Sequence, residues 1–112
     1  MAASRHAFDF GPFSLDVDRR LLLRGGAAVA LAPKVLETLV VLIEHRSRVL
    51  TKDELLQRIW GDTVVEEGGL ARNISVLRKV LGETPEDHRY IVTVPGLGYR
   101  LFLPSPQRRI RR

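Results

Sequence analysis

An amphipathic segment at residues 70–82 constrains the fold of this chain more than any other feature. With about 100° of rotation per helical residue, its large apolar side chains fall on one stripe: Leu70, Ile74, Leu77 and Leu81. Gly82 follows, where a glycine can end a helix in the left-handed conformation. We therefore expect a helix over about residues 67–82 that buries one side in the domain.

The other side of this helix is basic and able to form hydrogen bonds. On that face lie Arg72, Ser75, Val76 and Lys79, and on its flanks lie Asn73 and Arg78. Arginine can bond to guanine, asparagine can bond to adenine, and an apolar group can contact the thymine methyl. The pattern favours a helix that reads base edges in a DNA major groove. The alternative is an ordinary surface helix whose charges are solvated.

A β-hairpin is expected next, over residues 90–103. Residues 90–94 alternate in the manner of a strand, Pro95-Gly96-Leu97-Gly98 supplies a turn, and residues 99–103 return.

Two earlier helices precede this arrangement. Pro33 suits a first helical turn because its missing N–H needs no partner there, and apolar residues recur at helical spacing up to Ile43. Thr51 and Glu54 form a capping-box pattern at the start of the second helix. A loop over residues 61–69 follows. Before Pro33, four short apolar runs separated by turn residues predict a small antiparallel sheet.

The basic charge is concentrated at the C-terminal end. Of the 18 Lys and Arg residues, four lie in the last five positions, and the other 14 nearly balance the 13 acidic residues. Such a tail strengthens non-specific phosphate binding or begins a linker. We expect a flexible N-terminus at residues 1–6, one folded domain at 7–103 and a disordered basic tail at 104–112.

Several classes of protein are disfavoured. The chain has no cysteine, no signal-peptide core and no apolar run long enough to span a membrane. It shows no glycine-rich phosphate loop, no nucleophile beside a base and no metal-ligand spacing among its three histidines. We expect a cytoplasmic protein that is not an enzyme, with no metal, other cofactor, small-molecule substrate or membrane contact.

Three helices followed by a hairpin is the order of a winged helix, and six stretches in that order match a known family. They are residues 10–16, 31–39, 49–56, 59–61, 73–82 and 90–100. Over residues 7–103 the chain resembles the OmpR/PhoB-type winged helix-turn-helix DNA-binding domain. The resemblance implies an α+β fold with an N-terminal four-stranded antiparallel sheet, a three-helix core and a C-terminal hairpin wing.

The resemblance also implies how the domain works. As the DNA-binding domain of a bacterial-type transcriptional regulator, it would bind double-stranded DNA with its third helix in the major groove and its wing at the minor groove. Its loop 61–69 would contact RNA polymerase, and subunits would pair on direct-repeat sites. Because the domain stands at the N-terminus, it resembles the ToxR/CadC-like subgroup, so we expect no receiver domain before it and a sensory or repeat region after it.

Individual contacts follow from the helix pattern and the resemblance together. Base contacts are predicted for Arg72, Asn73, Ser75, Val76 and Lys79, although several relatives carry arginine at the position of Val76. Backbone contacts are predicted for Thr51, Lys52, Trp60 and Arg78, and Arg100 is predicted to enter the minor groove. Three residues keep an internal alternative: Thr51 as a helix cap, Trp60 as a half-buried core residue, and Arg78 in a salt bridge.

A second function stays open from the sequence. A winged helix can serve only in protein interaction, as an adaptor that docks through its third helix. DNA binding that depends on salt and is lost on changing Arg72 and Arg100 distinguishes the two functions.

Overall fold

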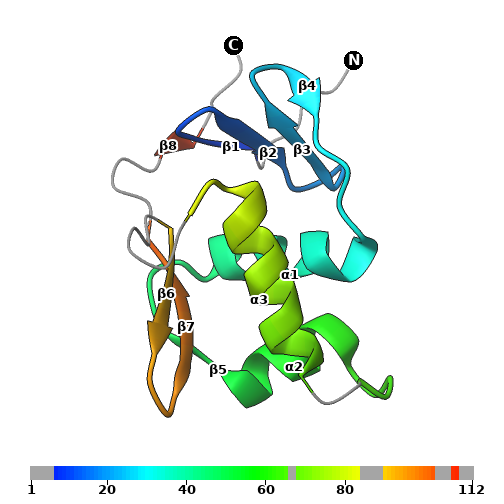
Figure 1. Cartoon of the computed structure of the whole chain (residues 1–112), viewed down its shortest axis with the longest axis vertical. Helices are drawn as coiled ribbons and strands as arrows, with labels where there is room; N and C mark the ends of the chain where they lie inside the picture. Colours follow the sequence, from blue (N-terminus) through cyan, green and yellow to red (C-terminus); the bar gives the residue numbers. More distant parts are fainter. Residues whose placement is uncertain (1–6, 66–67, 84–89, 103–106, 109–112) are drawn as a thin grey trace. The chain divides into compact units, whose positions relative to one another are not determined.

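The computed structural model describes residues 7–65, 68–83, 90–102 and 107–108, and it divides into two compact units (Figure 1). Within these ranges, the first unit contains residues 7–32 with 107–108, and the second contains residues 33–102. None of the helices that the structure describes is long and apolar enough to cross a lipid bilayer.

The first unit is an antiparallel sheet with the strand order β4-β3-β2-β1-β8. Its strands are β1 (Ala7–Phe10), β2 (Phe13–Asp16), β3 (Leu21–Arg24), β4 (Ala27–Ala28) and β8 (Gln107–Arg108). The alternation in β2 buries Phe13 and Leu15, and the Phe10 and Phe13 rings stack with their centroids 5.6 Å apart. The predicted N-terminal sheet of four strands is confirmed, and β8 adds a fifth.

Strand β8 lies within residues 104–112, the range for which the sequence predicts a disordered tail. Gln107 and Arg108 pair antiparallel with Asp9 and Phe8 of β1. Without them β1 would be an edge strand, whose unpaired N–H and C=O groups favour the addition of another strand. The charge and proline content of residues 104–112 do not indicate that part of this segment can pair with β1. The rest of the predicted tail and residues 1–6 lie outside the described residues.

The second unit confirms the predicted three helices and hairpin. Its elements are α1 (Pro33–Glu44), β5 (Leu50–Thr51), α2 (Lys52–Trp60), α3 (Gly69–Val80), β6 (Ile91–Val94) and β7 (Gly98–Leu101). The short strands form a sheet in the order β5-β7-β6. We call β6, β7 and the turn between them the wing. Helix α3 begins two residues later than predicted, and the wing lies within the predicted range.

Helix α1 packs against both α2 and α3. Its side chains Leu39, Leu42 and Ile43 have no exposed surface. The predicted apolar stripe of the third helix is buried as expected, at Leu70, Ile74, Leu77 and Leu81. Burying a leucine or isoleucine side chain contributes roughly 1.5–3 kcal/mol, so this stripe determines how α3 is rotated in the domain.

The end of α3 is also as predicted. Gly82 has φ of 80°, and its N–H bonds to the carbonyl of Lys79 at 3.1 Å. The N–H of Glu83 bonds to the carbonyl of Arg78 at 2.8 Å, which completes a Schellman motif. The chain therefore leaves the helix in a defined direction.

The base of the wing depends on a close backbone approach at Gly98. This residue pairs with Thr51 of β5, and a Cβ atom built on it would lie 1.9 Å from the Leu50 carbonyl oxygen. Only glycine leaves room for β5 and β7 at this separation.

We predict that Gly98→Ala lowers the free energy of unfolding by roughly 3 kcal/mol, because β5 and β7 must separate. Gly96→Ala is the matched control. A Cβ there meets no atom within 4 Å, and only the positive φ of 74° is unfavourable, so a loss of about 1–2 kcal/mol is expected. Urea unfolding of both variants measures the difference, and equal losses would contradict the steric argument.

The start of α2 is stabilised by the predicted capping box and by an added ion pair. Thr51 Oγ1 accepts the N–H of Glu54 at 3.1 Å, and Glu54 Oε1 accepts the N–H of Thr51 at 3.2 Å. Arg48 donates to both carboxylate oxygens of Glu54, at 3.0 and 2.7 Å. These bonds lower the pKa of Glu54 to about 2. The bond from Arg48 has the largest effect, and the bond from Thr51 has the next largest.

This pKa predicts how stability depends on pH. Because the pKa of Glu54 in the folded state is below its ordinary value of 4.5, the carboxylate stabilises the fold fully above about pH 5, and this contribution is lost as the pH falls towards 2. Wild-type protein should be more stable than Glu54→Gln at pH 7, and the difference should shrink at low pH. Glutamine can keep the capping bond, so the comparison removes the charge and the second bond from Arg48.

Urea unfolding between pH 7 and pH 2 measures this difference. Glu44→Gln is the control for removing one exposed carboxylate. A difference between wild type and Glu54→Gln that stays constant down to pH 2 would contradict the prediction.

Candidate nucleic-acid interface

The exposed side of α3 presents four of the five residues predicted to contact bases. Arg72, Ser75, Val76 and Lys79 are all exposed, at the spacing i, i+3, i+4, i+7 that places them on one face. Val76 is 37% exposed and leaves an apolar spot among polar groups. Helix α3 contains no acidic residue. The face can therefore meet phosphates and base edges without like-charge repulsion.

Asn73 lies elsewhere. Its side chain is 9% exposed, and its amide nitrogen is 3.3 Å from both the Lys34 carbonyl and Thr38 Oγ1 of α1. Thr38 Oγ1 in turn donates to the Lys34 carbonyl at 2.7 Å. Asn73 therefore joins α3 to α1, and in this structure its amide does not face outward with Arg72. The position of Asn73 on the flank of the helix does not predict which neighbouring element its amide bonds to.

Arg78 adopts the internal alternative that the sequence left open. Its Nη2 donates to the Ile91 carbonyl at 3.1 Å and to Thr93 Oγ1 at 2.7 Å. Its Nε lies 3.7 Å from Glu83 Oε1. The guanidinium thus joins α3 to the wing, and the phosphate contact predicted for it stays a prediction.

The wing presents Arg100 on its exposed face. Arg100 of β7 stands opposite Val92 of β6, and both are exposed. The neighbouring positions Ile91, Tyr99 and Leu101 are buried. Because side chains alternate between the two faces of a strand, Arg100 lies on the outer face and its neighbours pack inward.

The predicted backbone contacts on α2 differ in availability. Lys52 is exposed in the first turn, and Trp60 is half-buried in the last turn. The Thr51 hydroxyl is engaged in the capping box, which is the internal alternative. Close to Trp60, a Cβ added at Gly69 would lie 3.9 Å from the indole Cζ2 and 2.9 Å from Val65 Cγ2. Gly69 thus allows the start of α3 to approach the loop.

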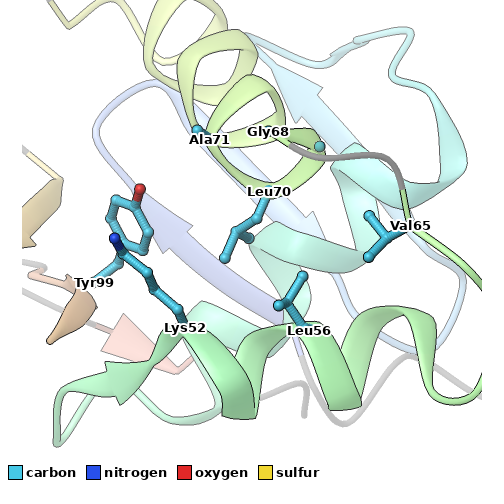
Figure 2. Close-up of a pocket in the computed structure, with 8 residues that line it drawn as sticks. Lys52, Leu56, Val65, Gly68, Leu70, Ala71 and Tyr99 are labelled. Carbon is cyan, nitrogen blue, oxygen red and sulfur yellow. The ribbon is translucent and has the colours of Figure 1, made fainter.

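A cleft of about 370 Å³ lies where α2, α3 and β7 meet (Figure 2). Lys52 and Tyr99 line one end of the cleft and Val65 lines the other. Apolar side chains, among them Leu56 and Leu70, line the space between. Lys52 of α2 and Tyr99 of the wing therefore lie beside each other at this cleft.

Two polar residues at this interface were not singled out from the sequence. Tyr99 belongs to a stretch that matches the family, but no separate signal gave it a role. Glu83 is 7% exposed and accepts the N–H groups of Tyr90 and Ile91, the second at 2.8 Å. The sequence shows a glutamate directly after a helix-ending glycine but not its burial, and a buried carboxylate must find donors nearby.

Comparison with known proteins assigns the family. The family described as "Transcriptional regulatory protein, C terminal" matches residues 26–101. The transcriptional regulator HilA of Salmonella typhi is 42% identical over 101 residues, which cover 90% of this chain and 18% of HilA. The chain thus spans less than a fifth of the length of this relative.

Two solved structures share the fold. The DNA-binding domain of Escherichia coli CadC has a TM-score of 0.74 and 32% identity, covering 91% of this chain and 96% of that domain. The DNA-binding domain of Klebsiella pneumoniae RstA, in complex with the RstA box, has a TM-score of 0.73 and 29% identity, covering 85% and 95%. The chain belongs to the family of OmpR/PhoB-type winged-helix DNA-binding domains of transcriptional regulators.

Proposed function

We propose that this chain binds double-stranded DNA in a sequence-specific manner, as the DNA-binding domain of a bacterial-type transcriptional regulator. The observation that supports this most strongly is the exposed face of α3. It gathers Arg72, Ser75, Val76 and Lys79 on one side of a helix without acidic residues. The likeness to the RstA domain, which was solved with the RstA box, also supports it.

In this proposal α3 occupies the major groove and its exposed side reads base edges. A bidentate bond from Arg72 to guanine O6 and N7 would discriminate against other bases by ~1–3 kcal/mol. Ser75 and Lys79 add hydrogen-bond donors, and Val76 can contact a thymine methyl. Asn73 is left out of this set because its amide bonds to α1.

Contacts outside α3 determine affinity and register. Lys52 is exposed at the N-terminal end of α2, where its ammonium group can bond to a phosphate. Trp60 is half-buried and can turn its indole N–H towards a phosphate. Arg100 on the outer face of the wing suits a narrow, A·T-rich minor groove with its strong negative potential.

Further aspects follow from this role. A regulator that binds the bacterial chromosome acts in the cytoplasm, and pairing of two domains on a direct repeat would lengthen the sequence that is read. Contact with RNA polymerase through loop 61–69 stays a prediction. In the described part of that loop, Val64 is 92% exposed and therefore available to a partner.

The first test is selection of bound sequences from a random duplex pool. We expect one enriched motif, with a spaced repeat if domains pair. Arg72→Ala should weaken binding to the selected duplex by ~1–3 kcal/mol and relax the preference at one base pair. Arg19→Ala is the charge-matched control, since it removes an exposed arginine from the turn after β2.

A pool that yields no motif even at low salt would contradict the proposal. The exposed face of α3 would then be a docking surface for a protein, and the adaptor function would replace DNA binding.

A second prediction separates packing from reading within α3. Asn73→Ala removes the amide that bonds to Lys34 and Thr38, so the free energy of unfolding should fall by roughly 1–3 kcal/mol. Ser75→Ala on the exposed side should change it by less than about 0.5 kcal/mol. Thermal or urea unfolding without DNA measures both. An equally small effect of Asn73→Ala would show that its amide is free to face DNA.

A further inference from the structure

The C-terminal end of α3 is bonded to the first strand of the wing through a buried carboxylate. Glu83 follows the helix-ending Gly82, and its side chain has no exposed surface. A single oxygen, Oε2, accepts the backbone N–H groups of Tyr90 and Ile91. The Glu83 side chain, just after α3, therefore holds Tyr90 and Ile91, the second of which begins β6.

Arg78 completes the connection from the last turn of α3. It donates from Nη2 to the Ile91 carbonyl and to Thr93 Oγ1. Ile91 is thus bonded through its N–H to Glu83 and through its C=O to Arg78. In the described part of the chain, β6 stands at the edge of the sheet β5-β7-β6. Arg78 and Glu83 therefore bond to backbone groups of Ile91 that face no neighbouring strand.

The ion pair between Arg78 and Glu83 makes a displacement of β6 unfavourable. Arg78 Nε and Glu83 Oε1 are buried, have no hydrogen-bond partner among the described residues, and lie 3.7 Å apart. The charge of the buried Glu83 carboxylate is compensated by Arg78 and by the N–H groups of Tyr90 and Ile91. A buried carboxylate without such partners is strongly unfavourable, so a displacement of β6 from the end of α3 is resisted.

We propose that Arg78 and Glu83 are positioning residues that hold the wing relative to α3. They determine how well Arg100 reaches the minor groove while α3 occupies the major groove, without themselves contacting DNA. The inference rests on the proposed function. Its physical basis is preorganisation: a wing that is already held in place loses less conformational freedom on binding.

A double-mutant cycle tests this coupling on the duplex selected by the wild-type protein. Arg100→Ala should weaken binding about tenfold in the wild-type background. In the Arg78→Gln background the same change should weaken it only about twofold, because the wing is no longer held. A direct phosphate contact by Arg78 would instead leave the two factors equal.

Thr93 offers a milder pair of variants in case Arg78→Gln fails to fold. Thr93→Val removes the hydroxyl that accepts from Arg78 and leaves the buried charges in place, whereas Thr93→Ser keeps a hydroxyl. The effect of Arg100→Ala should be reduced in the Thr93→Val background and retained in the Thr93→Ser background. Circular dichroism confirms that each variant is folded.

The outcomes distinguish a failure of the positioning role from a failure of DNA binding itself. Equal factors for Arg100→Ala in the wild-type, Arg78→Gln and Thr93→Val backgrounds would overturn the positioning role and leave DNA binding intact. A wild-type protein that selects no duplex would overturn the proposed function itself.

Discussion

The burial of one side of α3 is the constraint on which the rest of the site depends. Ile74 and Leu77 are almost completely buried in the helical core, and this packing sets the rotation of the helix about its axis. Once the rotation is set, Arg72, Ser75, Val76 and Lys79 must face outward, because they lie on the opposite side of the helix. The DNA-contacting face proposed here is therefore a consequence of apolar packing.

Polar side chains in and just after α3 have two different uses. Those on the outer face have no hydrogen bond or ion pair to another residue that the structure describes, whereas Asn73 bonds to α1, and Arg78 and Glu83 bond to the wing. These inward bonds position the elements that carry the outward groups. A polar residue in a DNA-binding helix can thus support recognition through geometry alone, and its chemistry does not show which use it has.

The prediction from sequence succeeded where one local rule decides the outcome. The capping box needs only Thr51 and Glu54 three residues apart, and the end of α3 needs only a glycine at position 82. No such local rule exists where the partner is distant in the chain. Asn73 meets Lys34 and Thr38 of α1, and β8 joins β1 from the other end of the sequence.

The sequence by itself determined the order of elements, their approximate limits and the family. These follow from apolar periodicity, caps and turns, which act over a few residues. Only the tertiary structure decided which polar groups of α3 point outward, which of them hold the wing, and that Tyr99 and Lys52 share a cleft. The physical reason is that a hydrogen bond or ion pair depends on which elements meet, and that depends on how the whole core packs.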